Sequence, residues 1–203
     1  MSLELWCAGD ERLAPSQDPR VAVAQLDAVV AVDPEVAVMG ERIRALVADA
    51  AGPADRTTRP GHLTGSAFVV SADGARAVLL FHTKLQRWLQ PGGHADGDLN
   101  LAAVALREAT EECGIVGLGV YPIAIDADIH EVRPPNEDAH LHLDLRFLVV
   151  APEGAELVAN HESEALRWVE RERLGDYELD AGLIRLAAAA FRRFDSGAND
   201  AGA

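Results

Sequence analysis

The chain has 203 residues, of which 49% are hydrophobic and 25% are charged, a mixture typical of a globular protein with an apolar core. Its 33 acidic side chains outnumber 18 basic ones and give a formal net charge of −15, which opposes binding to a nucleic acid polymer or to an anionic membrane surface. If a protein of this charge acts on phosphate compounds, it needs a cation as mediator.

The sequence shows no signal for a membrane or for disulfide bonds. No stretch approaches the roughly 20 apolar residues that span a bilayer, and the first residues lack the basic start and apolar core of a signal peptide. We therefore expect a cytoplasmic protein. Cys7 and Cys113 lie far apart without zinc-binding spacing, so we expect two free, buried thiols.

Residues 1–59 predict a helical extension rich in alanine, valine and acidic residues. Its clearest helix begins at Pro34, where Asp33 can cap it, and stops before Gly52 and Pro53. The apolar residues of that helix follow helical spacing, at Val36, Met39, Ile43 and Leu46. Two roles for the extension stay open, a cover over a substrate and a homodimer interface.

Residues 60–195 predict a single α+β domain. Apolar runs at 63–70 and 76–82 flank a Ser-Ala-Asp-Gly turn and predict a hairpin, while 118–132 and 139–151 predict a second strand pair. A short strand is expected at 164–170, and a C-terminal helix follows Asp180. Strands and helices mix without a regular βαβ rhythm. We expect residues 196–203 to form a disordered tail.

The segment 101–113 predicts a helix with three glutamates close together near its C-terminus. Asn100 is a good N-cap and Gly114 a good stop, while Glu108, Glu111 and Glu112 share one face of the last turn. Carboxylates there meet the negative end of the helix dipole, at a cost of about 0.3–1 kcal/mol each when exposed. Two interpretations follow, a solvated helix end and a site for a hard divalent cation, which takes carboxylate oxygens.

The spacing from residue 93 to residue 115 resembles the signature of the Nudix hydrolases. That signature is a glycine, five residues, a glutamate, seven residues, then Arg-Glu-aliphatic-x-Glu-Glu-x-Gly-aliphatic. The matching positions are Gly93, Arg107, Glu108, Glu111, Glu112, Gly114 and Ile115, with Ala109 as a small stand-in for the first aliphatic. Leu99 departs from the pattern, because the family usually has there a glutamate that supports the arginine. Asp98 is one position early and would point elsewhere.

The resemblance implies an α/β/α sandwich with a mixed sheet and an Mg²⁺- or Mn²⁺-dependent pyrophosphatase that cleaves a diphosphate linkage in a small nucleoside-diphosphate-type compound. It makes Glu108 and Glu112 the principal metal ligands and Glu111 a further ligand or base. Arg107 would orient the glutamates, and the Gly93 carbonyl would add a ligand. Some members place an additional catalytic acid later in the chain, for which Glu162 and Glu164 are candidates.

Two alternatives stay open on this fold. The first is a non-catalytic binding or regulatory domain, which the intact set of three glutamates disfavours. The second is chemistry like that of isopentenyl diphosphate isomerases, which share the fold and carry Cys-Gly-His where this chain has Gly92, Gly93 and His94. The missing cysteine disfavours it.

The predicted strand pair at 118–132 and 139–151 carries polar and apolar residues in strict alternation. If the strands pair with leucines opposite isoleucines, one face gathers several histidines, aspartates and an arginine. These are His130, His140, His142, Asp126, Asp128, Asp144 and Arg146. That face is either solvated or forms a substrate pocket or second metal site for Mn²⁺ or Zn²⁺, with His94, His140, His142 and Asp144 as its residues. His62, His82 and His161 are interpreted as structural or surface residues.

Overall fold

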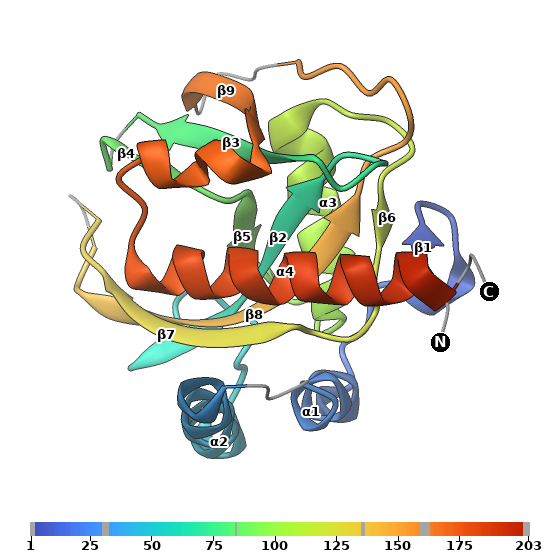
Figure 1. The fold of residues 1–203 in the computed structure, drawn as a ribbon. Helices are drawn as coiled ribbons and strands as arrows, with labels where there is room; N and C mark the ends of the chain where they lie inside the picture. The colour runs from blue at the N-terminus through green and yellow to red at the C-terminus, as the bar shows by residue number, and fades with distance from the viewer. Residues whose placement is uncertain (1–2, 30–32, 84, 135–136, 159–162, 201–203) are drawn as a thin grey trace.

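The structure is a computed structural model that describes residues 3–29, 33–83, 85–134, 137–158 and 163–200. Within these ranges nine strands form one mixed sheet, with helices on both of its faces (Figure 1). The strands are β1 Trp6–Cys7, β2 Gly61–Val70, β3 Arg76–His82, β4 Arg87–Leu89, β5 Gly92–His94, β6 Gly119–Val120, β7 Asp126–Val132, β8 His140–Val150 and β9 Ser163–Glu170. The α-helices are α1 Pro19–Asp27, α2 Pro34–Asp49, α3 Leu101–Cys113 and α4 Ala181–Asp200, and two short 3₁₀ helices are η1 Glu11–Leu13 and η2 Arg171–Asp176.

The sheet is organised around two long parallel strands. β2 and β8 pair from Gly61 opposite Leu141 to Val70 opposite Val150, and the strand order is β1-β6-β8-β2-β3-β4. β5 also pairs with β2, β7 with β8, and β9 with β3. β2 is buried along its whole length, as expected for a strand covered on both faces. The predicted α+β sandwich with a mixed sheet is confirmed.

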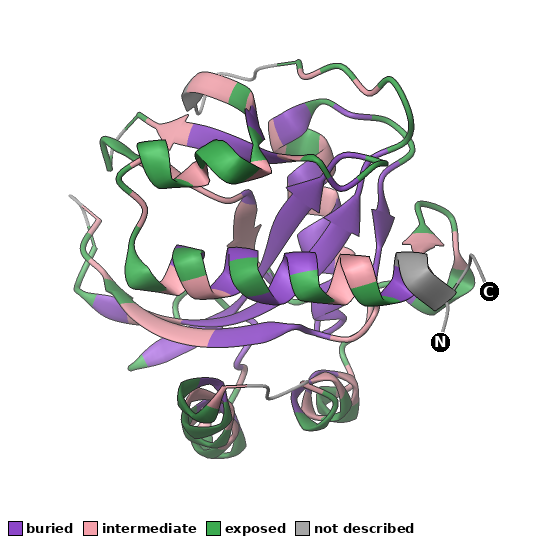
Figure 2. Cartoon of the chain, viewed as in Figure 1, coloured by how far each residue is buried: buried purple, intermediate pink, exposed green. Residues whose placement is uncertain are grey.

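Two apolar layers enclose the sheet. α3 packs on one face together with alternate residues of β2 such as Ala67 and Val69, whereas α4 packs on the other with Phe68 and Val70 (Figure 1). At Gly65 a Cβ atom would lie 2.8 Å from the Leu101 carbonyl oxygen, so glycine allows α3 to approach the sheet closely. Figure 2 shows the buried sheet between helices whose outer faces are exposed.

The two predicted hairpins fare differently. β7 and β8 pair with Ile129 opposite Leu143 and His130 opposite His142, so the predicted register is confirmed. β2 and β3 pair with each other at Val70 and Ala77, where the turn brings them together, but the rest of β2 pairs with β5 and β8. The hairpin that the apolar runs predicted is therefore limited to the residues next to its turn.

The N-terminal segment is not wholly helical. β1 adds a short strand next to β6, and α1 and α2 lie beside the sheet (Figure 1). Asp33 caps α2 as predicted, through a 2.8 Å hydrogen bond from the Glu35 N–H. Apolar residues of this segment, including Leu26 and Ile43, share one core with α3 and β8. The segment and the rest of the chain therefore form a continuous packed unit.

The C-terminal helix is longer than expected. Asp180 accepts a 2.8 Å hydrogen bond from the Leu183 N–H, which confirms the predicted start. α4 then continues to Asp200, so the prediction of a disordered tail from residue 196 is wrong as far as residue 200, and residues 201–203 lie outside the described ranges. No helix within the described ranges is both long and apolar enough to cross a membrane.

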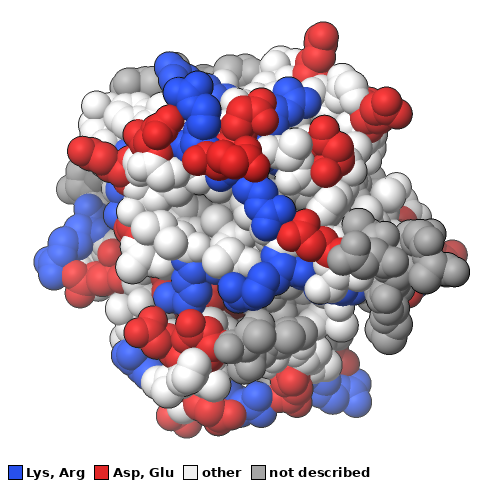
Figure 3. All heavy atoms as spheres, in the orientation of Figure 1, with Lys and Arg blue, Asp and Glu red and all other residues white. Residues whose placement is uncertain are grey.

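The face of the molecule shown in Figure 3 carries basic and acidic side chains side by side. Ion pairs among the exposed residues of the described ranges include Arg173 with Asp176 and Arg171 with Asp195. Exposed pairs of this kind contribute little to stability, typically about 0–1 kcal/mol each.

Candidate active site

The last turn of α3 lies against the short strand β5. The Gly92 N–H donates a 2.9 Å hydrogen bond to Oε2 of Glu112, and a Cβ atom at Gly93 would lie 2.4 Å from Oε2 of Glu108. Both glycines lie where a side chain would have little room, since a Cβ atom at Gly92 would lie 2.3 Å from Oγ of Ser66 and one at Gly93 would meet the Glu108 carboxylate. We refer to Glu108, Glu111 and Glu112 as the glutamate triad.

Arg107 is held by β5 and by its neighbour in sequence. Its Nη2 donates to the His94 carbonyl oxygen at 2.9 Å and to Oε1 of Glu108 at 2.8 Å. Leu99, which replaces the family's glutamate, is 5% exposed and packs in the core. Asp98 does not reach the arginine, since its Oδ1 accepts the N–H groups of Ser16 and Asn100. The support that Arg107 lacks at position 99 comes from a backbone carbonyl.

The N-terminus of α3 is capped by a distant residue. Asn100 occupies the N-cap position, but its side chain makes no capping hydrogen bond, contrary to prediction. Its Nδ2 donates instead to the carbonyl oxygens of Arg12 and Ala14. Gln25 of α1 takes the cap, because its Oε1 accepts the Leu101 N–H at 2.8 Å while its Nε2 donates to Oδ1 of Asn100. At the other end Gly114 adopts a φ of 65°, as predicted for a helix stop.

The three glutamates of the triad range from half-buried to exposed. The Glu108 side chain is 18% exposed, and burial raises its pKa, an effect that Arg107 opposes and Glu111 reinforces. Glu112 is half-buried and Glu111 exposed. Carboxylate oxygens and a backbone carbonyl are the ligands that Mg²⁺ and Mn²⁺ prefer, so this donor set fits such a cation. A cation would also offset the electrostatic cost of partly buried carboxylates at a helix C-terminus.

The polar face of β7 and β8 is neither solvated nor uniform. Its aspartates and Arg146 form a buried cluster with a residue of α4 that we call the ion network, composed of Asp126, Asp128, Asp144, Arg146 and Arg185. The Arg146 side chain is 5% exposed and lies between 2.8 and 3.2 Å from a carboxylate oxygen of each aspartate. The interpretation of this face as solvated is therefore wrong.

Within the ion network, the environments of the aspartates differ. Burial raises the pKa of Asp126, against the opposing effect of Arg185 and Arg146. Burial also acts on Asp128, but the hydrogen bond from His130 and the charge of Arg146 outweigh it and lower that pKa. Asp144 accepts hydrogen bonds from the hydroxyls of Thr64 and Ser66 as well as from Nε of Arg146. Its oxygens thus take part in the ion network and in hydrogen bonds to β2.

Histidines occupy the other half of the same face. The rings of His62, His94 and His142 lie with centroids 5.0–5.1 Å apart, and we call these three residues the histidine cluster. His62 is fully buried rather than a surface residue. Burial, together with His94 and His140, lowers its pKa to about 4, although a hydrogen bond with the Thr58 backbone acts to raise it. Burial and the neighbouring histidines lower the pKa of His142 to about 2. These imidazoles are neutral at pH 7.

The sequence missed His62 because its position depends on a long-range pairing. β2 lies parallel to β8 with His62 opposite His142, and periodicity alone cannot predict which strands become neighbours. His140 is adjacent, with its Nδ1 2.8 Å from the Asp138 carbonyl oxygen. Of the additional acid candidates, Glu164 lies in β9, where its backbone alone is described, and Glu162 lies outside the described residues, as does His161.

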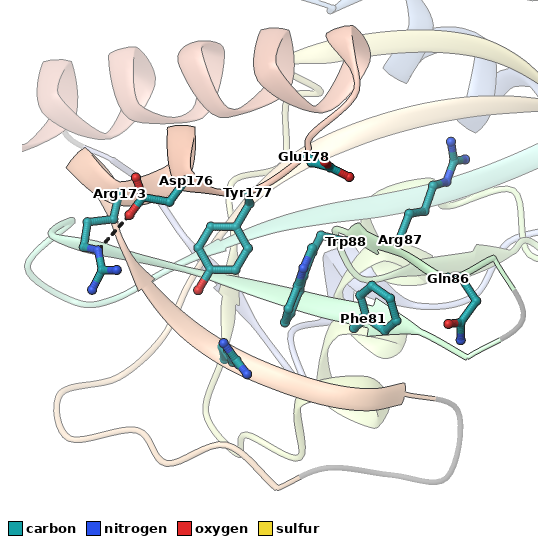
Figure 4. A pocket seen from close by; sticks show the side chains of 9 residues that line it. Phe81, Gln86, Arg87, Trp88, Arg173, Asp176, Tyr177 and Glu178 are labelled. Atoms are coloured by element: carbon teal, nitrogen blue, oxygen red, sulfur yellow. Dashed lines mark hydrogen bonds and ion pairs between the residues drawn. The ribbon is translucent and has the colours of Figure 1, made fainter.

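A separate pocket of about 510 Å³ opens beside η2 (Figure 4). Trp88 of β4 lies between Phe81 and Tyr177, with ring centroids 5.3 and 5.0 Å away, and the Arg167 guanidinium lies over its ring. Arg87 and Arg173 also line the pocket. Aromatic rings and guanidinium groups together suit a planar ring that carries negative groups. β4 ends three residues before Gly92, so the same chain segment leads from this pocket into the site.

Comparisons with known proteins identify the family of the chain. A family model described as "NUDIX domain" matches residues 62–190, well over half of the chain. The chain therefore belongs to the Nudix family, which confirms the resemblance read from the sequence.

The relatives show how far that agreement extends. A Mycobacterium tuberculosis protein named "Putative 8-oxo-dGTP diphosphatase 3" is 32% identical over 120 residues, covering 54% of this chain and 52% of that protein. The present chain thus spans about half the length of the curated relatives it matches. A C. elegans Ap4A hydrolase binary complex superposes with a TM-score of 0.53 at 18% identity, covering 66% of this chain and 98% of that one. At such identity the likeness shows the fold alone.

Proposed function

We propose that this protein is a divalent-metal-dependent pyrophosphatase that cleaves the diphosphate linkage of a small nucleoside-diphosphate-type compound by attack of water on phosphorus. The observation that carries the proposal is the packing of β5 against the last turn of α3, where two glycines fit tightly around Glu108 and Glu112. Membership of the Nudix family and a relative named as a diphosphatase support it.

Each residue of the site has a defined task in this proposal. Glu108 and Glu112 would hold Mg²⁺ or Mn²⁺ together with the Gly93 carbonyl, and Glu111 would serve as a further ligand or as the base. When bound, the cation would neutralise the diphosphate and lower the pKa of a coordinated water. Arg107 keeps the Glu108 carboxylate oriented from one side, and the Gly92 N–H fixes Glu112 from the other. Such preorganisation avoids reorientation of the carboxylates during the reaction.

The net charge of −15 is consistent with a cation-mediated reaction. A phosphate compound that approaches the glutamate triad meets like charge unless a cation is bound. We therefore expect activity to depend strictly on Mg²⁺ or Mn²⁺.

Isomerase chemistry has no support at position 92. In the isomerases that share this fold a cysteine stands there, whereas a Cβ atom at Gly92 would lie 2.3 Å from Oγ of Ser66. A side chain at this position would require Ser66 to move.

The test is product release from a panel of nucleoside diphosphate compounds with Mg²⁺ or Mn²⁺, compared between the wild type and Glu112→Gln. We expect the substitution to lower kcat about 100-fold or more, because it removes a metal-binding charge while keeping the shape of the side chain. Glu41→Gln on the exposed face of α2 is the matched control and should leave kcat unchanged. Chromatography of the products shows which phosphorus is attacked.

Two results would contradict the proposal. If Glu112→Gln keeps wild-type activity, the glutamate triad does not hold the essential metal. If the wild type binds compounds of the panel but hydrolyses none of them with either metal, the chain is a binding or regulatory domain on the Nudix fold.

A further inference from the structure

The histidine cluster brings three potential metal ligands together from three strands. His62 comes from β2, His94 from β5 and His142 from β8, and one ring nitrogen of each lies within 4.8 Å of the others. Three nitrogens bound to one tetrahedral Zn²⁺ at about 2.0–2.1 Å would be about 3.3 Å apart. Nitrogens that lie within 4.8 Å of one another would have to move closer by at most about 1.5 Å to share one ion.

Several of these nitrogens have no hydrogen-bond partner within the described residues. Apart from the Thr58 backbone, which acts on His62, neither ring nitrogen of this fully buried residue has a close partner in the described ranges, and Nε2 of His142 has none there. Leaving a buried polar atom unpaired is costly, and native proteins contain few such atoms. A bound cation would give buried nitrogens of this cluster a partner.

Two further histidines and an aspartate near the cluster have partners of their own. His130 lies 3.2 Å from the Asp128 carboxylate through its Nδ1, and His140 contacts the Asp138 carbonyl through its own. The nearby Asp144 is engaged by Thr64, Ser66 and Arg146. Residues held by such contacts can help to position the three histidines of the cluster without being metal ligands themselves.

We propose that His62, His94 and His142 bind one Zn²⁺ ion. Neutral imidazoles suit Zn²⁺, whereas Mg²⁺ prefers oxygen ligands, so this site and the glutamate triad should select different metals. This set differs from the one predicted from the sequence. His62 enters it, while His140 and Asp144, which make other contacts, leave it.

The zinc site lies on the opposite side of β5 from the glutamate triad. Gly93 faces Glu108 and α3, and the next residue, His94, turns its ring toward β2 and β8. Because the ligands come from three strands, Zn²⁺ binding ties these strands together and should raise the melting temperature. The inference does not depend on hydrolytic activity.

The test uses the full-length protein after removal of metal with a chelator. We expect wild type exposed to equimolar Zn²⁺ and then desalted to retain one zinc per chain by mass spectrometry, and its melting temperature to rise by several degrees. The His62→Ala/His142→Ala variant should retain at least tenfold less zinc. His82→Ala, a substitution on β3 outside the cluster, is the matched control and should retain the wild-type amount.

Two further measurements keep the outcome clear. The Glu108→Gln/Glu112→Gln variant should lose Mg²⁺-dependent hydrolysis but keep its zinc, which separates this proposal from the proposed function. Because replacement of a buried histidine can impair folding, X-ray absorption of zinc-loaded wild type should show three imidazole nitrogens at about 2.0–2.1 Å. Wild type that retains no zinc, equal retention by the double histidine variant, or a spectrum dominated by carboxylate oxygen would overturn the proposal.

Discussion

At the scale of single residues, the sequence pattern predicts groups that are close together in the chain and misses contacts made by the main chain. The spacing from Gly93 to Ile115 was sufficient to identify the glutamate triad, because the residues lie close together in the chain and their geometry is that of one helix turn. What supports Arg107 could not be read from the same stretch. Its partner is a main-chain oxygen, that of His94, and main-chain groups leave no mark on residue identity.

The two cysteines differ in a way that the sequence did not reveal. Cys113 is fully buried at the end of α3, whereas Cys7 is exposed on the short strand β1, so the expectation of two buried thiols is wrong for Cys7. Burial, with a smaller effect of the adjacent Glu112, raises the pKa of Cys113 to about 12. At pH 8 its reactive thiolate form is therefore absent.

We expect a thiol reagent at pH 8 to label one cysteine rapidly in the folded protein and the second after unfolding. Cys7→Ser should remove the fast reaction and leave the slow one. Two equally fast thiols in the wild type would show that the end of α3 opens in solution. The raised pKa of Cys113 also makes stability depend on pH. The protonated thiol leaves the folded state fully stable below the unfolded pKa of about 9, and the free energy of unfolding falls as the pH rises from there toward the folded pKa of about 12.

At the scale of elements, α1 completes the helix that carries the glutamate triad. Gln25 caps α3 from a distance of 76 residues in the chain and also binds Asn100, the residue that the sequence predicted as the cap. A local motif cannot predict such a contact, because the capping group belongs to a different element. The N-terminal segment thereby acquires a role besides the two considered, which were substrate cover and dimer interface.

We expect Gln25→Ala to lower the free energy of unfolding by about 1 kcal/mol, the usual effect of losing a helix cap. Urea denaturation followed by circular dichroism measures the change. Gln17→Ala, at an exposed position before α1, is the control and should shift the midpoint little. Equal stability of the two variants would mean that solvent caps α3 as well as Gln25 does.

Strand pairing marks the same limit of prediction. The alternation in β7 and β8 predicted their register, because a slip by one residue would bury aspartates among leucines. The parallel pairing of β2 with β8 joins segments about 80 residues apart, and residue types alone do not specify which distant strand becomes the neighbour. His62 entered the site through this pairing, which is why it was interpreted as a structural or surface residue.

At the scale of the whole molecule, the ion network fastens α4 to the sheet. Arg185 of α4 lies 2.9 Å from Oδ1 of Asp126, and Arg146 of β8 contacts aspartates from both strands of its hairpin. The sequence predicted that these charges share a face but not that a helix covers them. Removing one partner from such a cluster leaves buried charge uncompensated.

Arg146→Met should therefore lower the free energy of unfolding by about 3–5 kcal/mol, despite its similar volume and greater hydrophobicity. Thermal and urea denaturation both measure this loss. Arg20→Met removes an exposed pair with Asp18 and should cost less than about 1 kcal/mol. If the two variants are equally stable, water reaches the network and screens its charges.

The three residues of β5 have a practical consequence for handling this protein. One side of the strand meets carboxylates and the other meets imidazoles. With both proposed metal sites filled, a sample would carry two kinds of metal on this short strand. Protein eluted from a nickel column would bring Ni²⁺ on its histidines, and magnesium added in an assay would leave that ion in place. Preparations of identical sequence would then differ in metal content according to how they were purified. Their hydrolysis rates would become comparable after all metal is removed and a known amount is added back.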